Sequence, residues 1–139
     1  MNLDYIAGFV DGEGSICINK GTNNPLIQIA QANEDVLNVM RDLVGKGRVY
    51  KQKCYQPEKH KQVFNWVITG LDAIEFLETI SSKLIIKKKE AEVLIEGKHL
   101  FQRHKKKLSD ETIAGRENLR LLLQKLKKEP ALAGPSDQL

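Results

Sequence analysis

Residues 6–16 read IAGFVDGEGSI and place a helix directly before a strand, with almost no connecting residues between them. Apolar residues recur at helical spacing along this helix: Leu3, Ile6, Ala7 and Val10. Gly8 and Gly12 are four residues apart and share one face. Because glycine inside a helix costs roughly 1 kcal/mol relative to alanine, the pair predicts close approach of a second backbone, either within the chain or from another copy of it.

The end of the same helix carries two acids, Asp11 and Glu13, and Glu13 stands between Gly12 and Gly14. Glycines at a helix end allow a sharp turn and leave space around the acid. We expect the two acids to point to different sides of the helix end. A glutamate there meets the negative end of the helix dipole. A bound metal ion would offset that charge, and the alternative is an ordinary surface carboxylate.

This stretch resembles the LAGLIDADG motif, which names a family of homing endonucleases. The nine positions of the motif correspond to residues 6–14, read here as IAGFVDGEG. The chain departs from the consensus at Ile6, Phe9, Val10, Gly12 and Glu13. Glutamate replaces aspartate at the last of these, and both acids suit that place chemically. The sequence holds one copy of the motif, as in the single-motif, homodimeric members of the family.

Composition describes one basic domain. The chain has 139 residues, of which 41% are hydrophobic and 29% charged, and its formal net charge is +4. A basic domain is consistent with nucleic-acid binding, or with a mildly basic protein that has no such partner. Cys17 and Cys54 show no zinc or disulfide spacing, and no apolar run indicates a signal peptide or a membrane span. We therefore expect an intracellular protein, in the cytoplasm, the nucleoid or an organelle matrix.

Periodicity predicts an α+β chain in the order αββαββα, with further helices at the C-terminal end. The expected strands cover residues 15–20, 26–31, 48–54 and 61–69, and after the opening helix the expected helices cover 34–44, 71–80, 87–104 and 113–126. Asn33, Gly45 and the Ser109 segment give helix start and stop signals. This order favours a four-stranded antiparallel sheet with helices on one face, and the family resemblance implies a saddle-shaped sheet. We assign residues 1–128 to one domain and 129–139 to a loose tail.

Strand alternation leaves one sheet face free of helices, and the side chains expected there are mostly polar. Arginine and glutamine can pair with base edges in the major groove, and lysine or arginine can hold phosphates. The alternative is a solvated sheet face. The residues predicted to contact DNA, one of them (Asn24) in a strand connection, are Ser15, Cys17, Asn19, Asn24, Leu26, Gln28, Arg48, Tyr50, Gln52, Lys61 and Asn65.

The resemblance implies a catalytic centre at the base of the motif helix. It assigns a divalent metal ion, Mg²⁺ with Mn²⁺ or Ca²⁺ as substitutes for binding, to the Glu13 carboxylate and the Gly12 carbonyl. Gln31 aligns with a residue that positions solvent near the scissile phosphate. Lys87 aligns with a lysine that stabilises charge or activates solvent, although its register among residues 87–89 stays open. The basic run 103–107 is a second candidate for backbone contact, or a solvated helix end.

One acid per chain also favours a two-fold dimer, in which each chain supplies one Glu13. The residues assigned to that interface are Ile6, Gly8, Phe9, Asp11 and Gly12. The resemblance then implies a site-specific homing endonuclease, active in intron homing. It would bind a long, palindromic or near-palindromic duplex and cut both strands across the minor groove, leaving short 3′ overhangs. The alternatives are a non-cleaving regulator, an intron RNA maturase on the same scaffold, and a basic structural domain without a specific ligand.

Overall fold

The computed structural model describes residues 1–53, 58, 61–102 and 108–128. The end of the predicted third strand at Cys54, the turn at 55–57, the basic run 103–107 and the tail 129–139 lie outside the described residues. Within the described part no helix is long and apolar enough to cross a membrane.

Four strands form one antiparallel sheet in the order β1-β2-β4-β3, and helices follow in the predicted order. The strands are β1 (Gly14–Ile18), β2 (Pro25–Gln31), β3 (Arg48–Lys51) and β4 (Phe64–Thr69). The helices are α1 (Leu3–Glu13), α2 (Glu34–Val44), α3 (Gly70–Ile80), α4 (Lys88–Glu96) and α5 (Asp110–Lys127), with short 3₁₀ turns at Ser81–Lys83 and Lys98–Leu100. The predicted α+β class and the αββαββα order are confirmed.

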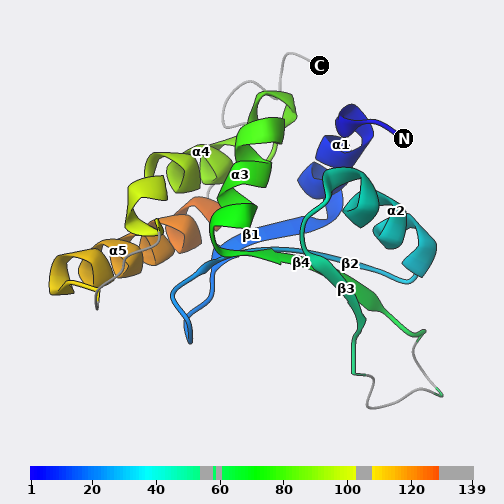
Figure 1. The fold of residues 1–139 in the computed structure, drawn as a ribbon, viewed down its shortest axis with the longest axis horizontal. Helices are drawn as coiled ribbons and strands as arrows, with labels where there is room; N and C mark the ends of the chain where they lie inside the picture. Colours follow the sequence, from blue (N-terminus) through cyan, green and yellow to red (C-terminus); the bar gives the residue numbers. More distant parts are fainter. Residues whose placement is uncertain (54–57, 59–60, 103–107, 129–139) are drawn as a thin grey trace.

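Helices cover one face of the sheet. In Figure 1, α1, α2 and α3 lie above the sheet, and the connection between β1 and β2 extends below it. The strand side chains under the helices are buried, with exposed fractions of 0–5% for Ile16, Ile18, Ile27, Ile29, Trp66 and Ile68. The residues between them face the other side, as strand alternation requires.

Helix caps follow the sequence closely. The Asn33 side chain accepts a hydrogen bond from the Val36 N–H at 3.1 Å and starts α2. Gly45 ends that helix with φ of 76° and donates its N–H to the Arg41 carbonyl at 2.7 Å. Ser109 caps α5 through the Thr112 N–H at 3.2 Å. These residues end or begin helices because their side chains or backbone angles satisfy the free groups there.

The predicted helix over 87–104 is wrong in its length, because α4 ends at Glu96. At Gly97 an added Cβ would lie 2.4 Å from Leu119 Cδ1, so α5 occupies the space that any larger side chain would need. The strands at 48–54 and 61–69 were also predicted too long. The pairing of β3 with β4 stops at Lys51 and Phe64, followed by one bond from the Gln52 N–H to the Val63 carbonyl at 2.9 Å.

Two glycines just after α2 have positive φ, but only Gly47 is enclosed. A Cβ at Gly47 would lie 2.6 Å from the Val67 carbonyl oxygen and 2.8 Å from Trp66 Nε1, whereas one at Gly45 would meet nothing within 4 Å. We expect Gly47→Ala to lower the free energy of unfolding by about 3 kcal/mol because the new methyl overpacks the core. Gly45→Ala, the matched control, should cost only about 1 kcal/mol of left-handed strain. Equal losses in urea denaturation would contradict this packing.

Candidate nucleic-acid interface and catalytic centre

The two acids at the end of α1 diverge. The helix turns about 100° per residue, so positions 11 and 13 lie on nearly opposite sides of the axis. Asp11 is 8% exposed, while Glu13, the last residue of α1, is exposed. The predicted difference in direction is therefore present in the structure.

Asp11 binds the segment that leads into α4, about 75 positions away in the chain. Its Oδ2 accepts from the N–H groups of Ile85 at 3.0 Å and Ile86 at 3.1 Å, and its Oδ1 accepts from the N–H of Lys87 at 2.9 Å. Three consecutive amides therefore share one carboxylate. Because both oxygens of Asp11 are engaged inside the protein, Asp11 does not compete with Glu13 for an external ligand.

A fourth hydrogen bond joins the Lys87 side chain to the Asp11 backbone. Its Nζ donates to the Asp11 carbonyl oxygen at 2.6 Å, so its positive charge lies at the C-terminal end of α1. A cation there is favoured by the negative end of the helix dipole. Lys88 and Lys89 are exposed, whereas Lys87 is half-buried. Of the three adjacent lysines, Lys87 is the one that the structure places against the motif helix.

Glu90, on the first turn of α4, is a charged neighbour that the sequence reasoning did not single out. Burial raises the pKa of the Glu90 carboxyl, and the nearby Lys127 and Lys87 charges act in the opposite direction. Glu90 therefore lies close enough to Lys87 for their charges to interact. The sequence spacing of residues 87 and 90 is the only early sign of this proximity.

A metal ion at the end of α1 would find Glu13 and a backbone carbonyl in one chain. Among the described residues, no group of three or more His, Cys, Asp and Glu side chains could hold a metal ion. Mg²⁺ commonly binds through one or two carboxylates together with waters and substrate phosphates. The exposed Glu13 carboxylate and the adjacent Gly12 carbonyl fit that pattern as one contribution to a shared site.

Gln31 lies at the end of β2, on the helix-covered side of the sheet by strand alternation. Its Oε1 accepts from the N–H of the next residue, Ala32, at 2.9 Å. No hydrogen bond within the described residues joins Gln31 to Glu13 or Lys87. The structure therefore brings Lys87 to the end of the motif helix, and the β1–β2 register, with Gly14 opposite Ile29, directs the end of β2 that carries Gln31 toward the same helix end.

The glycine face of α1 is open. A Cβ at Gly8 or Gly12 would meet nothing within 4 Å, so neither glycine is required by packing inside the protomer. Phe9 is half-buried and its ring contacts that of Tyr5 at 5.9 Å between centroids, with Tyr5 itself 50% exposed. The intramolecular explanation for the two glycines is therefore wrong.

Two residues expected on that face lie inside the protomer instead. Ile6 is fully buried in the core cluster, and Asp11 is turned toward the segment before α4. The helical period places position 6 on the opposite side of α1 from position 8, whereas Asp11, three residues after Gly8, lies at the edge of the glycine face and turns inward through its hydrogen bonds to the amides before α4. The open face consists of Tyr5, Gly8, Phe9 and Gly12.

The free face of the sheet is built from residues that the strand register places in rows. One row runs Ser15, Gln28, Val67 and Arg48 across the four strands, and the neighbouring rows contain Cys17, Leu26 and Thr69, and Ala30, Asn65 and Tyr50. The Arg48 guanidinium lies over the Tyr50 ring, 5.7 Å from its centroid. A base-sized ligand on this face would meet amides, hydroxyls and one guanidinium.

Two of the predicted DNA-contacting asparagines have other contacts. Asn65 is only 2% exposed, because the Gln28 and Gln52 amides cover it. Asn19 Oδ1 accepts from the N–H groups of Gly21 at 2.8 Å and Thr22 at 3.1 Å, which shapes the turn after β1. Direct base contact by Asn65 is therefore corrected to an indirect position, since a duplex would meet the two glutamines first.

Cys17 is half-buried on the free face. Burial raises the pKa of its thiol, while Lys127 and the Ser15 hydroxyl lower it. A thiol with a raised pKa is a poor nucleophile at neutral pH. Cys17 therefore contributes shape to this face rather than reactivity.

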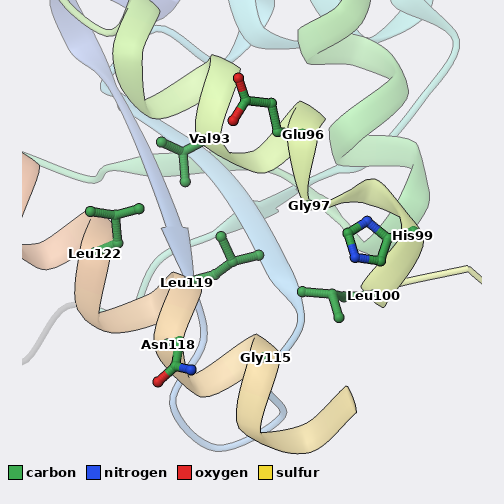
Figure 2. A pocket seen from close by; sticks show the side chains of 9 residues that line it. All are labelled: Val93, Glu96, Gly97, His99, Leu100, Gly115, Asn118, Leu119 and Leu122. Atoms are coloured by element: carbon green, nitrogen blue, oxygen red, sulfur yellow. The ribbon is translucent and has the colours of Figure 1, made fainter. Parts of the chain in front are cut away.

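A separate pocket of about 310 Å³ lies between α4, the following 3₁₀ turn and α5. Figure 2 shows Leu119 extending between Val93 and Leu100, with Glu96, His99 and Asn118 around them. Its lining includes no residue of α1 or of the sheet. The pocket is therefore distinct from the motif helix and from the polar sheet face.

Comparison with known proteins agrees with this architecture. A family model described as a LAGLIDADG-like domain matches residues 1–81, which is more than half of the chain. The chain belongs to the LAGLIDADG family. The match includes the motif helix, all four strands and the helices α2 and α3.

Solved structures extend the similarity to nearly the whole fold. The DNA-bound archaeal intron-encoded homing endonuclease I-Vdi141I is 23% identical with a TM-score of 0.64, over 91% of this chain and 82% of that chain. I-CvuI, in complex with uncleaved DNA in the presence of Mg, is 15% identical with a TM-score of 0.70, again over 91% and 82%. I-TnaI is 22% identical with a TM-score of 0.65, over 92% and 95%. No curated protein matched the chain.

These matches show that the chain has the LAGLIDADG endonuclease fold of single-motif relatives, including a four-stranded sheet and C-terminal helices. Relatives with this scaffold have been crystallised with DNA targets, and I-CvuI with Mg and with Ca.

Proposed function

We propose that this LAGLIDADG protein is a metal-dependent, site-specific DNA endonuclease that acts as a homodimer. The observation that carries the proposal is that the two acids of the motif have different surroundings. Both carboxylate oxygens of Asp11 accept from internal amides, whereas Glu13 is exposed at the end of α1, two residues beyond the Asp11 carbonyl that accepts from Lys87 Nζ. A pure binding protein has no need for an exposed carboxylate aimed at phosphate.

In this proposal Glu13 and the Gly12 carbonyl hold the divalent ion. Such an ion, when bound, polarises a phosphodiester and lowers the pKa of water. Lys87 keeps a positive charge at the end of α1, where negative charge develops on the phosphate, and Gln31 orients solvent. The positions of Glu13 and Lys87 support these roles, and the role of Gln31 rests on the family pattern.

The free sheet face supports duplex DNA as the substrate. Gln28, Gln52 and Arg48 offer the donor and acceptor groups that read base edges in the major groove. The exposed Lys61 lies just before β4, at the margin of this face, where it can contact phosphates. We propose that each protomer reads one half of a palindromic or near-palindromic site, with the cuts lying across the minor groove between the halves.

The open glycine face supports the dimer. Two α1 helices can approach closely only where neither carries a side chain, and Gly8 and Gly12 provide such a strip. Ile85 and Ile86, whose N–H groups bind Asp11 beside this helix, are 63% and 52% exposed and add apolar surface. Dimerisation through α1 would also bring two Glu13 side chains together, which supplies the carboxylates that one chain lacks.

Gly8→Ala tests the dimer, because it should act with opposite signs on monomer and dimer. In the isolated protomer the substitution should stabilise α1 by about 1 kcal/mol, since the methyl meets nothing and alanine favours helix. In the dimer the methyl would separate the two helices and weaken association at least about tenfold. Sedimentation equilibrium measures this directly. Val39→Ala, at an exposed position of α2, is the control that raises helix propensity away from α1. An unchanged dimer constant for Gly8→Ala would exclude the α1 interface.

The function itself is tested by incubating the protein with a randomised duplex library in Mg²⁺ and sequencing the new DNA ends. We expect one symmetric cut site with short 3′ overhangs. Enrichment of a bound site in Ca²⁺ without any cut in Mg²⁺ would instead support the regulator or maturase reading. Salt-sensitive binding with no sequence preference would support a basic domain without a specific target.

A further inference from the structure

Three amide side chains form a chain of hydrogen bonds diagonally across the free sheet face. Gln28 on β2 donates its Nε2 to Asn65 Oδ1 on β4 at 2.9 Å. Asn65 then donates its Nδ2 to Gln52 Oε1, just beyond β3, at 3.2 Å. Asn65 is 2% exposed, Gln28 is half-buried and Gln52 is exposed. The buried amide therefore connects two side chains that a bound duplex would reach.

An asparagine in this position imposes opposite polarity on its two neighbours. One side of its amide offers only an acceptor and the other side only donors. Gln28 must therefore turn its nitrogen toward Asn65, which leaves its Oε1 directed away. Gln52 must turn its oxygen toward Asn65, which leaves its Nε2 directed away. A reversed amide at either glutamine would leave a donor facing a donor or an acceptor facing an acceptor, and would leave the buried Asn65 unsatisfied.

We propose that Asn65 is a specificity-positioning residue, which fixes Gln28 as an acceptor and Gln52 as a donor toward DNA. This inference rests on the proposed duplex DNA substrate. At the exocyclic group that a base presents in the major groove, an acceptor selects the amino group of adenine or cytosine, and a donor selects the keto oxygen of guanine or thymine. Gln28 thus reads an amino base and Gln52 reads a keto base, although Asn65 itself touches neither.

A glutamine whose amide is free to rotate discriminates less between amino and keto bases than one held in a single orientation, because it can turn either its oxygen or its nitrogen toward the base. Discrimination then depends on what holds the amide. Within the described part of the chain, Gln28 and Gln52 are the glutamines on the free face, and both are supported by the same buried residue. Asn65 therefore couples two base preferences through one side chain.

Asn65→Asp tests the inference, because a carboxylate accepts on both sides. Gln28 keeps its present orientation and its amino-base preference. Gln52 must rotate to donate to the new carboxylate, which turns its Oε1 toward DNA. The preference at the base pair read by Gln52 should change from keto to amino by about tenfold, while the preference at the pair read by Gln28 should not change. Binding selections in Ca²⁺ from a randomised library give both preferences without requiring cleavage.

Gln52→Glu is a second variant at an exposed position, so folding is not at risk. It keeps the contact with Asn65 and presents an oxygen in place of the amino group, and it should shift the same base pair in the same direction as Asn65→Asp. Gln28→Ala and Gln52→Ala locate the two base pairs, because each loses one preference. Asn38→Asp, on α2 on the covered side of the sheet, adds the same charge and should change neither preference.

The outcomes separate this inference from the proposed function. If the wild-type protein enriches no sequence, the proposed DNA substrate is wrong. If the wild-type protein enriches a site and Asn65→Asp folds but only weakens binding evenly, Asn65 is a structural residue and the inference is wrong. If Asn65→Asp does not fold, Gln52→Glu decides, since an unchanged preference in that variant also overturns the inference.

Discussion

Glu13→Gln is expected to lower the rate of double-strand cleavage by about 1000-fold and to leave site binding in Ca²⁺ within about threefold. A factor of 1000 corresponds to about 4 kcal/mol of transition-state stabilisation. Glutamine keeps the size of the side chain and removes the negative charge that would hold a divalent ion. Because Glu13 is exposed and has no role in the core, the fold should be unaffected. Cleavage and binding are measured on the site recovered from the library.

Glu34→Gln is the matched control, an exposed glutamate in the first turn of α2. It should cleave at the wild-type rate. A Glu13→Gln protein that still cuts within tenfold of wild type would remove Glu13 from the catalytic centre. A loss of binding equal to the loss of cleavage would show that the carboxylate acts on DNA affinity rather than on the reaction.

Asp11→Ala is expected to lower the free energy of unfolding by about 3 kcal/mol, because it leaves three part-buried amide groups without an acceptor. For a chain of this size the melting temperature should fall by about 10 °C. The Lys87 Nζ would keep the Asp11 carbonyl as its acceptor, but the Lys87 N–H would lose the side-chain oxygen that fixes its backbone. Asp11→Asn keeps one acceptor oxygen, so its free energy of unfolding and melting temperature should lie between those of the wild-type and Asp11→Ala proteins. Thermal unfolding at a fixed protein concentration checks both values.

Asp4→Ala is the control on the same helix. Asp4 pairs with Lys83 at 2.6 Å, but the two side chains are 72% and 39% exposed, so the pair should contribute less than about 1 kcal/mol. Equal destabilisation by Asp4→Ala and Asp11→Ala would mean that the amide contacts of Asp11 do not stabilise the fold.

Local signals predicted most of the architecture. The start and stop of α2 at Asn33 and Gly45 match the structure to the residue, because caps act through neighbours in the chain. Strand alternation likewise separated Ile27 and Ile29 from Gln28. The end of α4 at Glu96 was missed, and the reason that position 97 needs glycine, the Leu119 side chain 2.4 Å from where a Cβ would lie, is distant in sequence. The end of β3 at Lys51 and the start of β4 at Phe64 were also missed, because the length of a strand depends on how far its partner strand pairs with it.

The candidate site was predicted in part. The sequence singled out Glu13 and Lys87, and their positions remain compatible with the roles proposed for them. It could not distinguish Asp11 from Glu13 by chemistry, since both are acids at one helix end. It also treated Asn65 as another exposed polar residue, because alternation reports which face a side chain occupies and not whether its neighbours cover it.

The sequence by itself determined the motif helix, the αββαββα order, the two faces of the sheet and the family resemblance, because these depend on short-range periodicity, caps and the identity of a few adjacent residues. Only the tertiary structure decided that Asp11 is held by the amides before α4, that Gly8 and Gly12 face outward, and that Asn65 connects Gln28 to Gln52. The physical reason is that hydrogen bonds and close packing join groups brought together by the fold, and separation along the chain carries no information about those partners.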